Sequence, residues 1–360
     1  MNPNKEKMDK HLALLQEELY FSIQNNEPLQ AIEFLKNNIQ FLNEVQAGIF
    51  NVPDVAGILK SIANIDLTTF PYGTIKPLIE KLGMVPSMSK FLYPGNGLIR
   101  ARPYEKGEKT FTKLSDLSFK PAELNTTYQR ASTPNQTVFY GTIANPKYDN
   151  GQFDSRLAGT LESMKWIHDP SVNRIQRIAF GRWDTTSKIR LNGVIHHKAF
   201  HPINNEIKEM YDEFNEFIQL IPEMQTGAAA IADFFSARFA DKEACPEKSH
   251  LYMLSAMWAE ASINAGLDGV LYPSVQSDGE HFCVALAPTS CAKLRLSVVG
   301  ESTIFKYKKQ VIMTNNLICE LNEGDKIFEM KPVEAKYARS EKLVLETFGL
   351  TNFNELEDLR

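Results

Sequence analysis

The sequence predicts an α+β protein in which a helical N-terminal region precedes a mixed region of short strands and helices. Two observations favour this class. Apolar residues recur at helical spacing through the first ninety residues, and short apolar runs bounded by glycine and proline begin near residue 97. The chain has 360 residues, of which 43% are hydrophobic and 23% charged. That composition is typical of a globular protein with one large domain or two modest ones.

The N-terminal region is expected to begin with a helical hairpin. Leucine and isoleucine recur every three or four residues over 12–23 and again over 29–42. Between them, the segment Asn25-Asn26-Glu27-Pro28 ends one helix and starts the next.

Two further helices are expected around residues 55–62 and 75–82, the second ending at Gly83. We therefore interpret residues 1–90 as a separate helical domain or cap.

The rest of the chain alternates between strand and helix patterns. Helices are expected at 155–166, 204–221, 227–240 and 251–265. Short strands are expected at 97–103, 137–143, 174–180, 188–195, 269–272, 282–287 and 294–299, followed by further short strands to about 321 and a charged tail helix. We expect a domain at 91–300, with 301–360 packed on its core.

Charge and hydropathy disfavour two classes of partner. Lys and Arg number 39 and Asp and Glu 44, so the net charge of −5 gives no basic excess for nucleic acid. The segment 227–240 is too short to span a bilayer and contains Asp233 and Arg238. We expect neither nucleic acid nor a membrane as a partner.

The cysteines and histidines indicate a cytoplasmic protein without a metal site. The four cysteines form no Cys-x-x-Cys pair, which fits free thiols in a reducing cytoplasm. His196, His197 and His201 crowd one segment, but their spacing is poor for zinc and no carboxylate or cysteine completes a ligand set.

A proline followed by a serine marks one candidate site. The strand Gly269-Val270-Leu271-Tyr272 runs into Pro273, which cannot extend a β ladder, so Ser274 is delivered to the rim of a sheet on a stiff turn. The simpler alternative is that Ser274 only ends a strand.

Two arginines form a second candidate site. Arg100 and Arg102 are two apart on an expected strand, so their side chains point to the same face. The guanidinium group suits phosphate or pyrophosphate through its planar fork. The alternative is a pair of surface salt bridges.

Three more residues join these candidates. Arg130 lies in a polar turn before the strand that brings Tyr140 beside Gly141, where a planar ligand has room. Glu162 flanks the apolar face of its helix, where a carboxylate is partly desolvated. Alternatively, Tyr140 is a core residue and Glu162 forms an exposed pair with Lys165.

The order of these residues resembles the RES domain family, which is named for its Arg, Glu and Ser. The resemblance covers about residues 98–299 and is strongest at Tyr272-Pro273-Ser274 and at Arg100-Ala101-Arg102; the family's glycine-rich Gly-Arg turn appears here only as Gln129-Arg130-Ala131-Ser132. By this resemblance Arg100, Glu162 and Ser274 are catalytic, and Arg100, Arg102, Arg130, Tyr140 and Ser274 bind the ligand.

The resemblance implies a split, bent β core related to ADP-ribosyltransferases and an activity that consumes NAD as substrate without a metal. Small family members act as bacterial toxins, so an antitoxin protein is an implied partner. A separate hypothesis, based on the size of the N-terminal helical region, is that these helices neutralise the enzyme in cis as an antitoxin would in trans. The acceptor of ADP-ribose is left open among water, inorganic phosphate and a protein side chain. The alternative function is a catalytically silent module that binds NAD or ADP-ribose.

Overall fold

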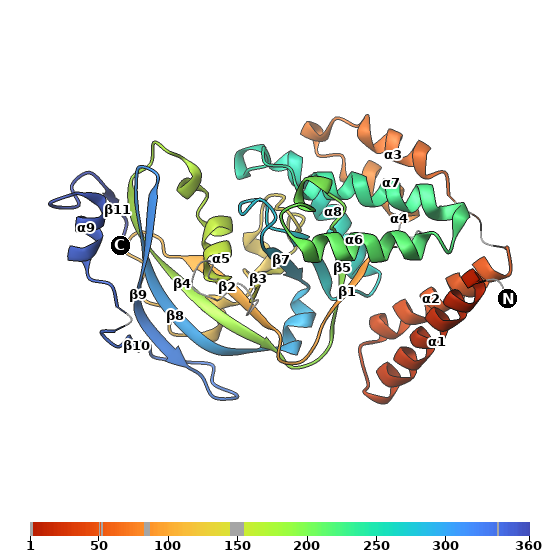
Figure 1. Cartoon of the computed structure of the whole chain (residues 1–360), viewed down its shortest axis with the longest axis horizontal. Helices are drawn as coiled ribbons and strands as arrows, with labels where there is room; N and C mark the ends of the chain where they lie inside the picture. Colours follow the sequence, from red (N-terminus) through yellow and green to blue (C-terminus); the bar gives the residue numbers. More distant parts are fainter. Residues whose placement is uncertain (1–2, 50, 52, 83–86, 145–154, 337) are drawn as a thin grey trace.

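The computed structural model describes residues 3–49, 51, 53–82, 87–144, 155–336 and 338–360. It shows an α+β fold with a helical N-terminal region, as the sequence predicts. Helices α1–α4 and α6–α8 gather at one end of the molecule, whereas the long strands lie at the other end together with α5 and α9 (Figure 1). The helix end expected at Gly83 lies outside the described residues.

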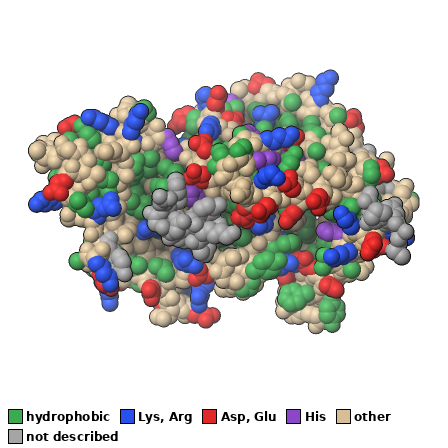
Figure 2. Space-filling view, viewed as in Figure 1, with side chains coloured by type: hydrophobic (Ala, Val, Ile, Leu, Met, Phe, Trp, Pro, Cys, Tyr) green, Lys and Arg blue, Asp and Glu red, His purple; other side chains and the backbone are tan. Residues whose placement is uncertain are grey.

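The N-terminal helices are α1 (Pro3–Gln24), α2 (Leu29–Gln46), α3 (Val55–Ala63) and α4 (Tyr72–Leu82), with a 3-10 turn at Leu67–Thr69. Asp54 begins α3 by accepting a hydrogen bond from the Gly57 amide at 2.9 Å, which satisfies one of the free donors of the first turn. The expected hairpin is confirmed as α1 and α2, which project from the body in Figure 1. Tyr20 and Phe21 near the end of α1 and Leu29 at the start of α2 have exposed side chains. Figure 2 shows hydrophobic side chains at the lower edge of the molecule, where Figure 1 places the hairpin.

A buried arginine fastens this hairpin to the sheet. The Arg190 guanidinium, on strand β5 (Ile189–Gly193), donates to Glu18 and Glu27 at 2.7 Å each and to the Ser22 hydroxyl at 2.9 Å. Only 2% of the Arg190 side chain is exposed, and both carboxylates are largely enclosed. We call Arg190, Glu18, Glu27 and Ser22 the Arg190 clasp.

In the described residues, eleven strands form a single mixed sheet. Most neighbours are antiparallel; β5 with β6 and β4 with β11 are parallel. The path runs β1-β5-β6-β7-β3-β2-β4-β8-β9-β10, with β11 pairing β4. Besides β5, the strands are β1 (Ser89–Leu92), β2 (Gly97–Pro103), β3 (Phe139–Ala144), β4 (Arg174–Thr185), β6 (Gly269–Pro273), β7 (Phe282–Leu286), β8 (Leu294–Tyr307), β9 (Gln310–Glu320), β10 (Lys331–Pro332) and β11 (Glu357–Asp358).

The remaining helices cover this sheet in two places. Helix α5 (Ser155–Ser163) lies beside β2 and β3, whereas α6 (Asn205–Ile218), α7 (Pro222–Phe239) and α8 (Met253–Asn264) pack together near β5 and β6 (Figure 1). Helix α9 (Glu341–Phe348) lies at the far end, near the C-terminus. Short 3-10 turns occupy 114–117, 122–124, 165–168, 198–200, 246–252 and 288–293.

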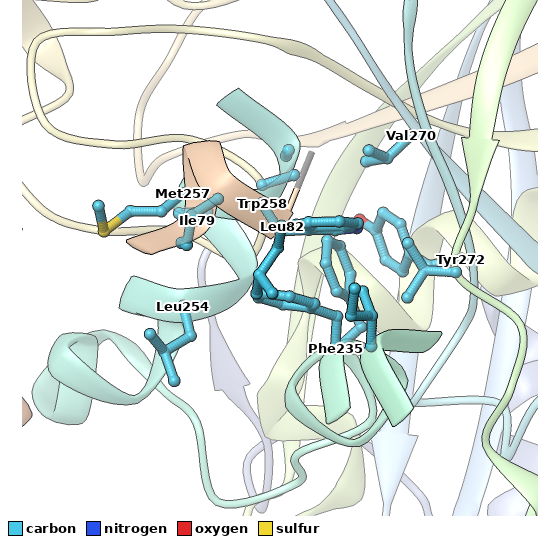
Figure 3. Packing of buried hydrophobic residues seen from close by; sticks show 14 of the residues in the cluster. Ile79, Leu82, Phe235, Leu254, Met257, Trp258, Val270 and Tyr272 are labelled. Carbon is cyan, nitrogen blue, oxygen red and sulfur yellow. The ribbon is translucent and has the colours of Figure 1, made fainter. Parts of the chain in front are cut away.

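Two main apolar clusters lie on opposite faces of the central strands. On one face, Trp258 stacks on Phe235 with ring centroids 4.1 Å apart, and Tyr272 of β6 lies beside them (Figure 3). On the other face, Phe139 of β3 meets Trp183 of β4 edge-on at 5.4 Å. Side chains of one strand alternate between these clusters, so the sheet separates them.

The C-terminal strands are longer than the sequence predicts. Strand β8 runs to Tyr307 rather than Val299, and β4 runs to Thr185 rather than Phe180, because the two strands pair with each other over their full lengths. Pairing of β8 with β9 extends the same surface. The expected domain boundary at residue 300 therefore lies inside β8, and the expected boundary at residue 90 lies inside β1.

The surface of the molecule is mixed in charge. Lys and Arg side chains alternate with Asp and Glu over the face shown in Figure 2. None of the helices in the described ranges is long and apolar enough to cross a lipid bilayer.

Candidate functional site

Glu162 and Ser274 meet across a large sequence separation. The Ser274 hydroxyl donates to Glu162 Oε1 at 2.7 Å, and the Gln276 amide donates to the same oxygen at 3.2 Å. Ser274 is fully buried, whereas Glu162 is only half-buried. Two of the three residues expected to be catalytic therefore form one contact, with the carboxylate at the edge of the protein interior.

Small residues allow α5 to bring Glu162 to this place. A side chain at Gly159 would place its Cβ 3.0 Å from the Cβ of Ala101, so glycine permits the helix to lie close against β2. The Thr142 hydroxyl of β3 donates to the Ser155 carbonyl at 3.2 Å. The last turn of α5 then points Glu162 toward the end of β6.

A tight loop holds Ser274. Its amide donates to the His281 carbonyl at 2.7 Å, and its carbonyl accepts from the Gly279 amide at 2.8 Å. The Ser277 amide donates to the Ser274 hydroxyl oxygen at 3.2 Å, which leaves the hydroxyl proton for Glu162. Residues 274–281, which we call the Ser274 loop, thus orient this hydroxyl through three backbone contacts.

Buried tyrosines and a thiol surround the carboxylate. Tyr140, Tyr272 and Cys283 belong to the same face of the sheet, and Cys283 is close enough to Glu162 for the carboxylate to act on its thiol electrostatically. Burial raises the pKa of Tyr140 to about 12 and raises the pKa values of Tyr272 and Cys283 well above their usual range. All three groups are therefore neutral at physiological pH.

Arg130 lies on this face but is held by backbone carbonyls. Its guanidinium donates to the carbonyls of Phe239, the last residue of α7, and of Asp241 just beyond that helix, and only 7% of Arg130 is exposed. Arg130 also lies 5.1 Å from the centre of the Tyr252 ring. It thus carries a buried positive charge at the C-terminal end of a helix, where the backbone dipole favours a cation.

The polar turn that contains Arg130 is fastened to Tyr140. The Tyr140 hydroxyl accepts from the Ala131 amide at 3.0 Å and lies 3.3 Å from the Ser132 hydroxyl. The structure therefore brings Arg130, Tyr140, Glu162 and Ser274 to one face of the sheet.

Arg100 and Arg102 point to the opposite face. Arg100 lies 5.3 Å from the Phe139 ring centre, and Arg102 lies 4.2 Å from that of Phe111, whereas Ala101 between them contacts α5. The two arginines share a face, as strand alternation predicts, but the sheet separates their side chains from Glu162.

Each of these arginines has a different set of contacts. Arg102 forms an ion pair with Glu108 at 2.9 Å. Arg100 donates to the Tyr140 carbonyl at 2.8 Å, and its Nε is buried without a hydrogen-bond partner among the described residues. Burial lowers the Arg100 pKa to about 10, so the group stays charged at neutral pH.

Lys165 and Tyr252 belong to the site but were not expected there. Lys165, the alternative partner of Glu162, instead donates to the Tyr252 hydroxyl at 2.8 Å, and that hydroxyl donates to the Ala244 carbonyl at 2.6 Å. Lys165 follows Glu162 by three residues, but α5 ends at Ser163 and Lys165 lies in the 3-10 turn 165–168, so the helix expected over 155–166 is shorter than predicted. No local signal places Tyr252 there.

Two hollows lie away from this contact. One, of about 460 Å³, lies along α1 and α2 and is lined by residues such as Leu19, Ile39 and Ile49. A small cavity of about 20 Å³ lies beside His196 and Ser236. Neither is lined by Glu162 or Ser274, so the chemistry of the side chains rather than the size of a hollow identifies the site.

The histidine segment packs against aromatic rings, and His196 Nδ1 lies 3.0 Å from a carboxylate oxygen of Asp233. His196 lies 4.5 Å from Tyr211 between ring centroids, and burial lowers the pKa values of His196, His197 and His201. Within the described ranges, no three His, Cys, Asp or Glu side chains are grouped to hold a metal ion.

Comparison of the chain with protein-family models, curated proteins and solved structures gave no match in any of the three. The geometry of the Glu162 face is therefore the basis for a functional proposal.

Proposed function

We propose that this chain is a cytoplasmic enzyme that cleaves the bond between nicotinamide and ribose in NAD. The observation that carries the proposal is the contact of Glu162 with Ser274, which are 112 residues apart. A carboxylate held at the edge of the interior by a hydroxyl and an amide is the group that this reaction needs. The sequence resemblance to the RES domain family supports the same reaction.

The chemistry follows from charge. Departure of nicotinamide builds positive charge on the ribose ring, as in glycoside hydrolysis, and a nearby carboxylate stabilises that charge. Unit charges about 4 Å apart attract by about 4 kcal/mol at an effective dielectric of about 20. If that attraction exists mainly in the transition state, it accelerates the reaction about a thousandfold.

The other residues then take supporting roles. Ser274 and the Gln276 amide fix the orientation of the carboxylate, and Tyr140 provides a flat ring on the same face. Arg130 and Lys165 supply positive charge for the two phosphates of NAD.

The location of Arg100 changes the role that we propose for it. Because its guanidinium lies across the sheet from Glu162 and holds the Tyr140 carbonyl, we propose that Arg100 supports β3 and does not bind the phosphates. Arg102, which pairs with Glu108, has the corresponding role at the end of β2.

Replacement of one carboxylate tests the proposal. Glu162→Gln keeps the shape of the side chain and removes its charge, and we expect nicotinamide release from NAD to fall about a thousandfold. The matched control is Glu209→Gln, an exposed glutamate of α6, which should release nicotinamide at the wild-type rate. Chromatography of the products made with and without inorganic phosphate or a protein extract identifies the acceptor.

Equal nicotinamide release by wild type and Glu162→Gln would contradict the catalytic role. Calorimetric binding of ADP-ribose by a wild-type protein that releases no nicotinamide would show a silent binding module instead. Co-purification of a second protein that suppresses release would reveal the antitoxin implied by the family resemblance.

A further inference from the structure

Asn204 links the start of α6 to the Ser274 loop. Its side-chain oxygen accepts hydrogen bonds from the Glu206 and Ile207 amides at 3.0 and 3.4 Å, which caps the helix. Its side-chain nitrogen donates to the carbonyls of Gly279 and Glu280 at 3.2 Å each. Asn204 is 2% exposed, so all four contacts are made inside the protein.

The loop that Asn204 holds has little freedom to adjust. Gly279 has φ of +87°, a conformation that side chains rarely adopt. A Cβ there would lie 2.6 Å from the Phe200 ring, on the segment that leads into Asn204. The loop is thus packed against the same segment that supplies its two side-chain hydrogen bonds.

The far end of this loop holds the catalytic contact. The Gly279 amide donates to the Ser274 carbonyl at 2.8 Å, and Ser274 in turn donates to Glu162. A continuous series of hydrogen bonds therefore joins the cap of α6 to the Glu162 carboxylate.

We propose that Asn204 is a positioning residue that holds the Ser274 loop in the conformation that orients Glu162. This inference rests on the proposed NAD cleavage for its kinetic consequence. The structural claim, that Asn204 holds the Ser274 loop in place, is tested by a measurement that does not depend on NAD turnover.

The two ends of the Asn204 side chain can be separated by substitution. Asn204→Asp keeps an oxygen that caps α6 but replaces the donating nitrogen by a second oxygen, which faces the two loop carbonyls. Asn204→Ser also caps the helix and is too short to reach the loop. Both variants should therefore fold with α6 intact and release the Ser274 loop.

Alkylation of Cys283 measures the movement of the Ser274 loop independently of NAD cleavage. The residue is 4% exposed and belongs to the strand that directly follows the Ser274 loop, so we expect its alkylation to accelerate when the loop opens. Mass spectrometry of iodoacetamide-treated protein measures its labelling separately from that of Cys291, which contacts the Ala287 carbonyl and serves as an internal control.

For Asn204→Asp we expect labelling of Cys283 to accelerate about tenfold or more while Cys291 is unchanged. We expect kcat/KM for nicotinamide release to fall about 30-fold, as for the loss of two hydrogen bonds. In a Ser274→Ala background, the same substitution should lower kcat/KM by less than about twofold, since the contact that Asn204 supports is already absent.

Unchanged Cys283 labelling in both Asn204 variants, with thermal melting showing folded protein, would overturn the proposal. A full additional loss of kcat/KM in the Ser274→Ala background would overturn it as well, because Asn204 would then act by another route. Absence of NAD cleavage in the wild type would refute the proposed function, while Cys283 labelling would still decide whether Asn204 holds the loop.

Discussion

Two buried arginines of this protein are stabilised in different ways. Arg190 lies between two carboxylates and a hydroxyl, whereas Arg130 is surrounded by neutral backbone carbonyls. A buried charge is costly unless it is paired. Arg190 is paired with carboxylates, whereas no carboxylate of the described residues forms an ion pair with Arg130. The comparison suggests that the first region is built for stability and the second for an anionic ligand.

Removing Arg190 should have the largest effect on stability. Arg190→Met leaves Glu27 enclosed without its counter-charge and leaves Glu18 with Lys188 alone, and we expect the free energy of unfolding to fall by about 3–5 kcal/mol. Urea denaturation followed by circular dichroism measures the change. Arg295→Met, at an exposed arginine of β8, is the matched control and should change stability by less than about 0.5 kcal/mol. Similar small effects of both substitutions would show that the clasp is not structural.

Removing Arg130 should lower the stability of the protein less than removing Arg190 does, and it should weaken the binding of ADP-ribose. Arg130→Met leaves only neutral carbonyls without a donor, so we expect a loss of about 1–3 kcal/mol in unfolding free energy. Affinity for ADP-ribose, measured by calorimetry, should fall about tenfold or more because a phosphate contact is lost. An unchanged affinity, with a loss of stability as large as that of Arg190→Met, would place both arginines in the same structural class.

The smallest expected effect is the pH dependence of the stabilisation that Glu18 provides. Burial raises the pKa of Glu18, but hydrogen bonds from Arg190 and Lys188 outweigh burial, so its pKa lies below the usual 4.5. Because the folded-state pKa is depressed, the stabilisation is complete above about pH 4.5 and is lost as the pH falls through the folded value. The stability difference between wild type and Glu18→Gln should therefore shrink as the pH is lowered from 6 toward 3 in urea titrations. A difference that stays constant over this range would contradict the pairing.

The sequence predicts local features of the site well. The proline at 273 places Ser274 at the end of a strand, and the helical repeat places Glu162 beside an apolar face. Strand alternation also predicts that Arg100 and Arg102 share a face. Each of these predictions depends on residues within a few positions of one another.

Long-range features could not be predicted in the same way. Which face of β2 is covered by α5 depends on the packing of Gly159 against Ala101, and alternation alone does not specify it. The polar side chain of Asn204 signals the start of a helix, but nothing near it points to Gly279. Strand β8 is longer than the sequence predicts because its pairing with β4 and β9 continues through Gly300.

The Arg190 clasp limits how the N-terminal helices can be studied. A truncated chain that started after residue 90 would leave Arg190 in the sheet without Glu18 and Glu27, and would expose a charge that the intact protein encloses. Loss of activity in such a fragment would then report misfolding and not a regulatory role of the helices. Substitutions of exposed residues near the end of α1, such as Phe21→Ser, leave the clasp residues in place and examine that region in the whole protein.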